Sequence, residues 1–180
     1  MAEFNRIKRE LEHKGVIVDF YADYVETPNG KVAKWDFIKH KGAAAIVAVD
    51  EEGKVLLVRQ WRNAVDDYTL EIPAGGLNPD ETDMKLCAVR ELEEETGYRT
   101  DYDKTEHLFD IYTTVAFCNE KIGVYYTNSL YPSKQNLDED EFINVERYTL
   151  DEVTEMILAG KIVDNKTVSS ILAYKAKMGL

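Results

Sequence analysis

The sequence predicts an α/β fold, a sandwich of helices around a mixed sheet, and two observations support this prediction. Short β-type runs and helical segments follow one another in an irregular order, unlike the strict alternation of a regularly wound parallel sheet. Residues 43–50 form a continuous apolar run, AAAIVAVD, which is typical of a strand covered on both faces. Such a strand belongs in the middle layer of a sandwich.

The first half of the chain is expected to be rich in strands. Residues 16–25 and 31–40 alternate in β-type runs, and Asn29-Gly30 lies between them. Asn-Gly between two such runs is a strong signal for a β-hairpin. Beyond the apolar run, we expect a strand at residues 54–61 and a short one at residues 68–75.

The second half of the chain combines helices with strands. Residues 90–97, RELEEETG, predict part of one helix, which Gly97 can end in the left-handed conformation. The other expected elements are strands near residues 108–114, 121–128 and 142–149, a helix from Asp151 to about Ala159, and a last helix capped by Asp164 or Asn165 that runs to about Lys177.

Composition agrees with a soluble intracellular protein, including an enzyme. A chain of 180 residues fits one domain, or one domain with a small extension, and can bury a substantial core. The net charge of -12 argues against a nucleic acid as partner, because two polyanions repel each other. A nucleotide is still compatible with this charge, since a bound cation can offset both the protein and the phosphates.

Two further observations concern the cellular compartment. Cys87 and Cys118 form neither a CxxC motif nor a disulfide framework, and we interpret them as packed thiols. The N-terminal residues MAEFNRIKRE lack an apolar signal core, and no apolar run approaches membrane-spanning length. We therefore expect a cytoplasmic protein without a membrane partner.

The predicted acidic helix carries four carboxylates within five residues: Glu91, Glu93, Glu94 and Glu95. On a helix, Glu91 faces both Glu94 and Glu95, and like charges at this spacing destabilise an isolated helix. A divalent cation such as Mg²⁺ or Mn²⁺ would turn this repulsion into coordination. The alternative is a solvated acidic face, the commonest meaning of a run of charges.

The order of residues around these carboxylates resembles a known family. Arg90-Glu91-Leu92-x-Glu94-Glu95-x-Gly97-Tyr98 matches the second half of the signature of Nudix hydrolases. The first half departs by one residue, because five residues lead from Gly75 to Glu81 but eight separate Glu81 from Arg90. One extra residue at the start of the helix explains this difference and leaves Glu81 as the intended acid. On general grounds, Arg90 can also pair with Glu94 one turn later.

The resemblance extends to the ADP-ribose pyrophosphatase branch of this family. The context Glu71-Ile72-Pro73-Ala74-Gly75 is similar to a loop whose carbonyl, here that of Ala74, is a metal ligand in that branch. Taken alone, the two glycines of the loop Pro73-Ala74-Gly75-Gly76 fit either a plain tight turn or a close approach of the backbone to a ligand. The RQxR pattern also matches, so Arg62 and, less clearly, Arg59 are candidates to bind the diphosphate, with structural ion pairs as the alternative.

A second loop provides the candidate base. In the resembling branch, a glutamate of this loop approaches the metal-bound water, and residues 136–142, which we call the acidic loop, match that pattern. Glu139 is the first choice and Glu141 the second, while a solvated acidic turn is the alternative. Two departures concern the substrate: the usual Ser-Pro-Gly turn reads Val115-Ala116 in its last positions, and a usual arginine is Trp35. An indole can stack on a base or pack in a core, but it cannot clamp a phosphate.

The resemblance implies an α/β/α sandwich at residues 42–180, the Nudix hydrolase domain, with a small β-rich extension at residues 1–41 that forms a homodimer. The implied reaction is hydrolysis of a nucleoside diphosphate linked to another moiety, with ADP-ribose giving AMP and ribose 5-phosphate. Mg²⁺, or Mn²⁺, would be held by Ala74, Glu91, Glu94 and Glu95, and Glu139 would take the proton of the attacking water.

Two alternatives keep part of this interpretation. A nucleotide sugar or another dinucleotide would be cleaved by the same chemistry. A metal-free sensor would bind such a ligand without cleaving it, but the intact carboxylates Glu91, Glu94 and Glu95 oppose the binding of a diphosphate without a cation.

Overall fold

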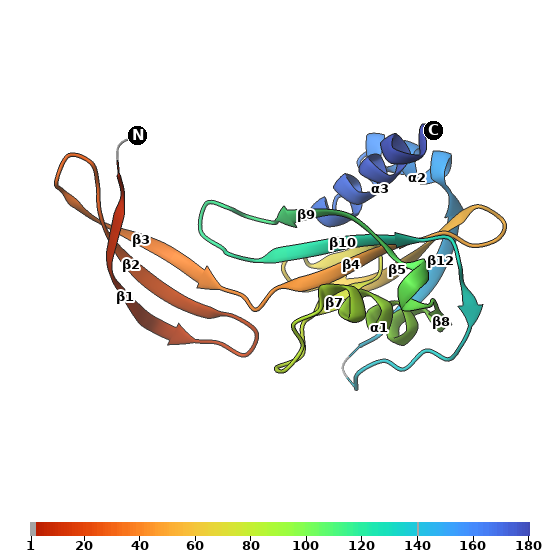
Figure 1. Cartoon of the computed structure of the whole chain (residues 1–180), viewed down its shortest axis with the longest axis horizontal. Helices are drawn as coiled ribbons and strands as arrows, with labels where there is room; N and C mark the ends of the chain where they lie inside the picture. Colours follow the sequence, from red (N-terminus) through yellow and green to blue (C-terminus); the bar gives the residue numbers. More distant parts are fainter. Residues whose placement is uncertain (1–2, 140) are drawn as a thin grey trace. The chain divides into compact units, whose positions relative to one another are not determined.

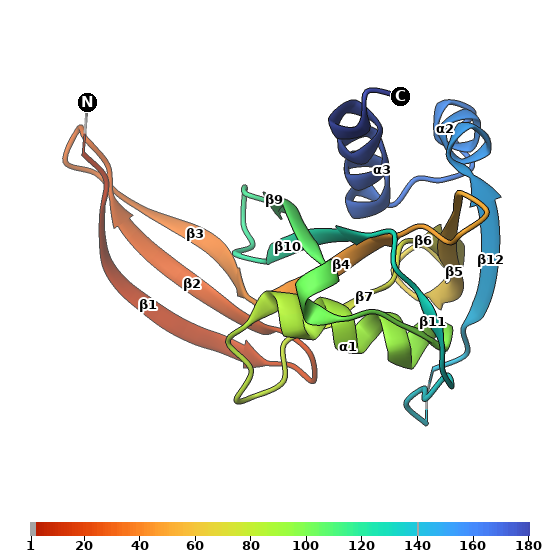
Figure 2. The same cartoon turned by 45° about the vertical axis from the view of Figure 1, so that its right-hand side comes forward.

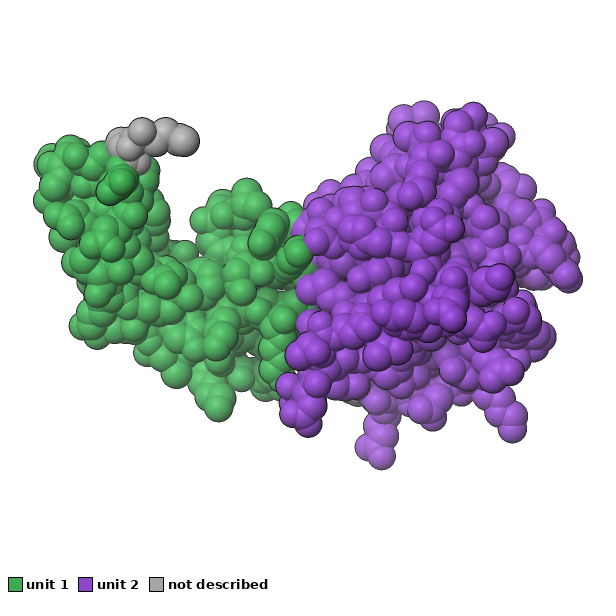
Figure 3. Space-filling model, viewed as in Figure 1, with its two compact units in different colours: residues 1–42, 112–121 green, residues 43–111, 122–180 purple. Residues whose placement is uncertain are grey.

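The computed structural model describes residues 3–139 and 141–180, and the chain divides into two compact units (Figure 3). The N-terminal unit comprises Met1–Gly42 and Tyr112–Lys121, and the sandwich unit comprises Ala43–Ile111 and Ile122–Leu180. The first boundary lies one residue from the predicted one. The inclusion of residues 112–121 in the N-terminal unit was not predicted.

The N-terminal unit contains a three-stranded antiparallel sheet in the order β1-β2-β3. Its strands are β1 (Asn5–Lys14), β2 (Asp19–Glu26) and β3 (Val32–Lys39). The predicted hairpin joins β2 to β3, with Glu26 opposite Val32 and Gly30 at a φ of 75° in the turn. Strand β1 was not predicted from the sequence.

Residues 112–121 join the N-terminal unit through backbone bonds to the end of β3. The amide of Ile38 donates to the carbonyl of Phe117 at 2.7 Å, and the amide of Asn119 donates to the carbonyl of Ile38 at 3.3 Å. The side chain of Asn119 also accepts from the amide of His40 at 2.8 Å. These pairings between distant residues explain why the unit is not one continuous stretch of sequence.

The sandwich unit contains a mixed sheet in the order β7-β4-β10-β9. Strand β4 runs parallel to β10 and antiparallel to β7, which confirms the predicted mixed sheet. The strands are β4 (Ala43–Ala48), β7 (Ala74–Gly76), β9 (Glu106–Tyr112) and β10 (Lys121–Thr127).

A second, antiparallel sheet has the order β12-β5-β6, and a two-stranded ladder joins β8 to β11. The strands of the second sheet are β5 (Lys54–Arg62), β6 (Asp67–Glu71) and β12 (Asn144–Thr149). The ladder strands are β8 (Tyr98–Arg99) and β11 (Tyr131–Pro132), and a short 3₁₀ helix, η1, spans Tyr102–Lys104.

Strand β4 lies between two apolar clusters, because successive side chains of a strand point to opposite faces. Ala45 and Val47 belong to the cluster that contains residues of α2 (Leu150–Leu158) and α3 (Asn165–Met178). Ala44 and Ile46 belong to the cluster that contains Leu92 of α1 (Met84–Thr96). Figures 1 and 2 show α1 on one face of the sheet and α2 and α3 on the other. The predicted α/β/α sandwich is therefore confirmed.

The helices begin and end at residues whose side chains or conformations fit these positions. Asp83 caps α1 by accepting from the amides of Lys85 and Leu86, and Gly97 ends the helix at a φ of 70°, as predicted. Thr149 caps α2 in a capping box, one residue before its first helical residue, whereas the prediction opened this helix at Asp151. Asp164 is the cap of α3. Within residues 3–139 and 141–180, no helix is long and apolar enough to cross a membrane.

A buried network of charges ties the β5–β6 hairpin to the start of α3. Glu71 is 2% exposed, and its carboxylate accepts from Nε and Nη2 of Arg62, each at 2.7 Å. The ammonium of Lys166 also binds Glu71, and it reaches Asp164 at 2.9 Å. Burial alone would raise the pKa of Glu71, but the bonds and charges of Arg62 and Lys166 outweigh it and lower this pKa to about 2.

We expect Glu71→Gln to lower the free energy of unfolding by about 3 kcal/mol at pH 7, because it removes the buried negative charge that Arg62 and Lys166 share. Chemical denaturation monitored by circular dichroism measures this change. The exposed pair of Glu52 with Lys54 gives a matched control, since Glu52→Gln should change stability by less than about 0.5 kcal/mol.

The lowered pKa of Glu71 also predicts how the stability of the protein depends on pH. The pKa of Glu71 is lower in the folded protein than the usual 4.5, so its contribution is complete above that value and is lost as the pH falls towards 2. The difference in stability between the wild type and Glu71→Gln should therefore narrow between pH 5 and pH 2. A constant difference over this range would contradict the assignment.

Candidate active site

Two glutamates of helix α1 lie against the backbone of β7. Glu95 is 3% exposed, and its carboxylate accepts from the amide of Ala74 at 3.0 Å. Leu92, on the same side of the helix, is fully buried in the core. The core contact of α1 therefore places Glu95 beside the loop that the sequence predicted as part of a metal site.

Gly75 allows Glu91 to lie against the same loop. A Cβ atom at Gly75 would come within 2.1 Å of the carboxyl carbon of Glu91, so any other residue there would force this carboxylate to move. At Gly76, a Cβ atom would meet nothing within 4 Å. Gly75 therefore lets the carboxylate of Glu91, on α1, come close to the backbone of β7.

Arg90 connects the carboxylates to the segment before the helix. Its Nη1 lies 2.7 Å from Glu94, the predicted pair, and 2.7 Å from Glu91. Its Nη2 donates to Glu81 at 3.0 Å and to the carbonyl of Gly76 at 3.1 Å. Glu81 precedes α1 and is placed as a partner of Arg90.

The buried carboxylates have strongly raised pKa values. Burial raises the pKa of Glu95 to about 8; the amide of Ala74 opposes this, and the charges of Glu91 and Glu141 add to it. Burial likewise raises the pKa of Glu91 to about 7. The charge and hydrogen bond of Arg90 oppose this increase, and the charges of Glu94 and Glu141 add to it. Perturbed carboxylates of this kind are common at functional sites, because a ligand or a cation there can compensate their charge.

The donor chemistry of this cluster fits a hard divalent cation. Carboxylate and carbonyl oxygens are the ligands that Mg²⁺ prefers, and Glu95 has a backbone amide as its hydrogen-bond partner. Among the described residues, however, no group of three or more His, Cys, Asp and Glu side chains is already gathered to hold a metal ion. Glu91 and Glu94 contact Arg90 instead, so a cation would have to draw these carboxylates towards itself.

The two predicted diphosphate-binding arginines form ion pairs with acidic side chains. Arg62 binds the buried Glu71, and Arg59 donates to Glu146 at 2.5 Å through its Nε. Of the two interpretations that the sequence left open, the structural ion pair is the arrangement observed for both.

Trp35 is 48% exposed on β3 of the N-terminal unit, so it is not a core residue. Its ring lies 5.9 Å from that of Phe4. It also lines a pocket of about 660 Å³ together with Phe20 and Phe117.

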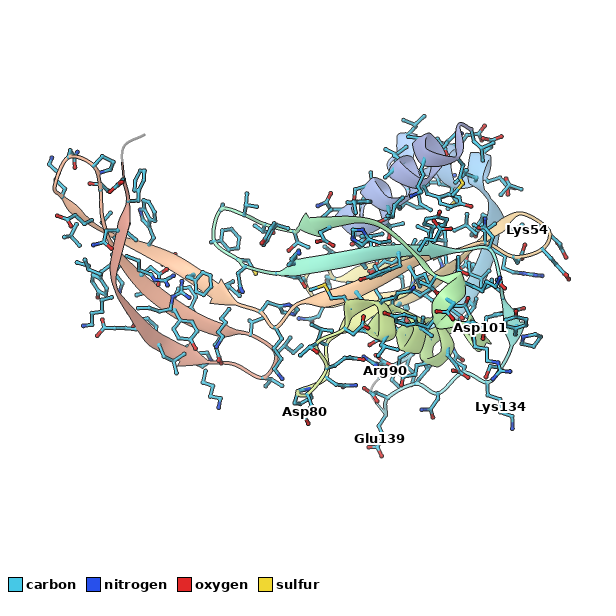
Figure 4. The ribbon with its side chains drawn as sticks, in the orientation of Figure 1. Lys54, Asp80, Arg90, Asp101, Lys134 and Glu139 are labelled. Atoms are coloured by element: carbon cyan, nitrogen blue, oxygen red, sulfur yellow. The ribbon has the colours of Figure 1, made fainter. Side chains whose placement is uncertain are left out.

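The two candidate bases of the acidic loop differ in their surroundings. Glu139 is exposed, and Figure 4 shows its side chain pointing outward from the loop. Glu141 is one of the charges that raise the pKa values of Glu91 and Glu95. Glu141 is exposed as well, and Asp140 lies outside the described residues.

Three residues near the site were not predicted from the sequence. The fully buried hydroxyl of Thr167 accepts from the amide of Ile72 at 2.9 Å, and Lys166 binds Glu71, so the start of α3 supports the segment that leads to Ala74. Gln135 donates from its side chain to the carbonyl of Glu95 at 2.7 Å. The predicted cap at Asp164 marked the start of α3, where Lys166 and Thr167 lie, whereas no motif in the sequence marked Gln135.

Comparison with known proteins identifies the class to which this fold and site belong. The family model of the NUDIX domain matches residues 39–169, which include β4, β7 and the whole of α1. The chain belongs to the NUDIX domain family, and this confirms the resemblance found in the sequence.

Individual relatives extend over almost the whole chain. The ADP-ribose pyrophosphatase of Bacillus subtilis (strain 168) is 37% identical over 180 residues, which cover 99% of this chain and 96% of the relative. The methanol dehydrogenase activator of Bacillus methanolicus is 39% identical and covers 94% of this chain and 91% of its own length. A crystal structure of an ADP compounds hydrolase has the same fold, with a TM-score of 0.85 over 98% of this chain and 95% of that chain at 18% identity.

We expect Gly75→Ala to disrupt the site, because its Cβ would displace the carboxylate of Glu91. The variant should lose at least tenfold in hydrolytic turnover but should keep a nearly unchanged melting temperature, because the group that has to move is the end of a flexible side chain. Gly76→Ala is the matched control, because both its backbone conformation and the space around it accept a Cβ. Equal losses in the two variants would show that the close approach of Glu91 is not what requires the glycine.

Proposed function

We propose that the protein hydrolyses the diphosphate bond of nucleoside diphosphates linked to another moiety, with ADP-ribose as its substrate and AMP and ribose 5-phosphate as products. The observation that supports this most directly is the pair of carboxylates, the buried Glu95 and the largely buried Glu91, packed on β7 at Ala74-Gly75. Relatives named ADP-ribose pyrophosphatases that align over nearly the whole chain support the choice of substrate.

Mg²⁺, or Mn²⁺ in its place, is the proposed cofactor, held by Glu91, Glu94, Glu95 and the carbonyl of Ala74. When bound, such an ion neutralises the diphosphate and makes a water molecule more acidic. Arg90 keeps Glu91 and Glu94 close to the turn through its two contacts at 2.7 Å.

Glu141 is our revised choice for the group that takes the proton of the attacking water, ahead of Glu139. Its charge acts on both buried carboxylates, whereas the side chain of Glu139 points outward. A general base must come within hydrogen-bond reach of the proton it removes, and this requirement favours the residue whose charge acts on the carboxylates of α1.

Three further residues are proposed to bind the substrate. Arg62 and Arg59 would contact the diphosphate by exchanging part of their bonds to Glu71 and Glu146 for phosphate oxygens. Trp35 would stack on the base, since its half-exposed indole and the neighbouring aromatic rings of Phe20 and Phe117 offer an apolar surface.

The proposal includes a homodimer formed through the N-terminal unit. Ile7, Leu11, Val16 and Val32 are each more than half exposed there, and exposed apolar side chains of this kind favour association with a second copy. A cytoplasmic location is also part of it, in agreement with two free cysteines, Cys87 and Cys118.

A screen of substrates tests the proposed function. Hydrolysis in the presence of Mg²⁺ should be compared for ADP-ribose, nucleotide sugars, dinucleoside polyphosphates and nucleoside triphosphates. ADP-ribose should give the highest kcat/KM. A preference for nucleotide sugars would favour the second candidate, which is suggested by a GDP-mannose pyrophosphatase of Cronobacter sakazakii (strain ATCC BAA-894), 34% identical over 136 residues. No hydrolysis of any of them would overturn the proposal.

We expect Glu95→Gln to keep the fold but to lose most turnover at limiting Mg²⁺, because an amide oxygen is a neutral and weaker ligand. Mg²⁺ should also raise the melting temperature of the wild type more than that of this variant, since binding to the native state stabilises it. Glu93→Gln is the control on the same helix, because the carboxylate of Glu93 contacts Ser133. An unchanged response of Glu95→Gln to Mg²⁺ would remove Glu95 from the metal site.

The assignment of the base predicts a contrast between two variants. Glu141→Gln should lower kcat at saturating substrate by on the order of a hundred- to ten-thousand-fold, the usual contribution of a general base. Its Mg²⁺ dependence should stay nearly unchanged, and Glu139→Gln should be milder. The reverse order of kcat values would return the role to Glu139.

A further inference from the structure

The end of α1 is completed by the segment that leads into the acidic loop. The last turn of a helix leaves carbonyl groups without intrahelical donors. In this protein, the amide of Asn136 donates to the carbonyl of Glu94 at 2.9 Å, and Nε2 of Gln135 donates to the carbonyl of Glu95 at 2.7 Å. Two consecutive carbonyls at the C-terminal end of the site helix therefore depend on residues about 40 positions later in the chain.

Gln135 makes a second bond from the same nitrogen. Nε2 also donates to the carbonyl of Ile143 at 3.3 Å, just before β12 begins. An amide nitrogen has two hydrogens, so it can serve both carbonyls, whereas the amide oxygen in that place would face two acceptors. One side chain thus joins the two ends of the acidic loop, and it joins both to α1.

The backbone around Gln135 lies close along the end of the helix. The amide of Ser133 donates to the carbonyl of Gly97 at 2.7 Å, and a Cβ atom at Gly97 would come within 3.0 Å of the amide nitrogen of Gln135. Gln135 therefore extends its side chain from a segment that is itself fixed to α1.

Within the acidic loop, Glu141 has only short-range partners among the bonds described. Its carboxylate accepts from the amide of Asp138 at 3.1 Å, and its own amide donates to the carbonyl of Asp138 at 3.0 Å. Bonds within a loop set its local shape but do not fix its position on the protein. That position depends on the anchors at the two ends of the loop, where the side chain of Gln135 adds to the backbone bond between Asn136 and Glu94 and is the one group that binds both ends.

We propose that Gln135 is a positioning residue for the reaction: its side-chain amide binds the carbonyls of Glu95 and Ile143 and so holds the acidic loop, with Glu141, at the C-terminal end of α1. The kinetic consequence rests on the proposed function and on the role of Glu141 in it. The structural consequence, a loop held to the helix by this amide, does not depend on either.

Gln135→Met tests the kinetic consequence, because methionine is similar in length and shape but has no hydrogen-bond donor. Displacing a catalytic group by about 1 Å can cost up to about a hundredfold, so kcat should fall by on the order of ten- to a hundredfold while KM changes less than about twofold. Asn136→Ala is the neighbouring control, since Asn136 contributes its backbone amide and should keep its kcat. A kcat of Gln135→Met equal to that of the wild type would overturn the proposal.

A double-mutant cycle shows whether Gln135 acts through Glu141. If it does, Gln135→Met should have no further effect on kcat in the Glu141→Gln background. An equal fold loss in both backgrounds would show that Gln135 acts independently of Glu141, which contradicts the proposal.

Hydrogen exchange measures the loop itself, without substrate. Gln135→Met should speed the exchange of backbone amides in residues 137–139 and 141–143 and leave the middle of α1 unchanged, because local opening depends on local contacts. Unchanged exchange in the loop would overturn the inference even in an active enzyme. A wild type that hydrolyses none of the substrates would overturn the proposed function alone, and exchange would then decide on the role of Gln135.

Discussion

The site depends on the close packing of α1 against the middle of the sandwich. Small buried side chains lie between them, with Ala44 and Ala48 on β4 and Cys87 and Ala88 on α1. This spacing brings the helix near enough for Glu91 to lie on Gly75 and for Glu95 to accept from the amide of Ala74. Larger side chains at these positions would move the helix outward and separate its carboxylates from the turn.

The elements that the sequence predicted well are those with a strong local pattern. The apolar run became the fully buried β4, Asn29-Gly30 became the turn of a hairpin, and Gly97 ended α1 in the left-handed conformation. Strand β1 and the ladder of β8 with β11 were missed, because they are exposed or short and have no clear alternation. The inclusion of residues 112–121 in the N-terminal unit depends on bonds to β3 about 80 residues earlier, which no local pattern encodes.

In the candidate site, too, the features with a local sequence pattern were predicted and those that depend on distant residues were not. Spacing on one helix predicted the ion pair of Arg90 with Glu94. The partners of Arg62 and Arg59 could not be decided, because a guanidinium at the end of a strand suits a phosphate and a carboxylate equally well. The choice between Glu139 and Glu141 depended on the course of an irregular loop, and Gln135 acts through carbonyl groups, which carry no sequence signature.

The support that α3 gives to the turn at Ala74 affects the order in which the nascent chain can complete its site. Thr167 and Lys166 hold the segment of Ile72 and Glu71, although they are made almost 100 residues later. On the ribosome, α1 and β7 can therefore emerge well before the residues that fix the loop between them and the core. Until α3 has emerged and packed, Glu71 and Arg62 lack Lys166, the second cation of their network. During that time the emerging chain contains the glutamates of the site, but the segment that leads to Ala74 is not yet held in place.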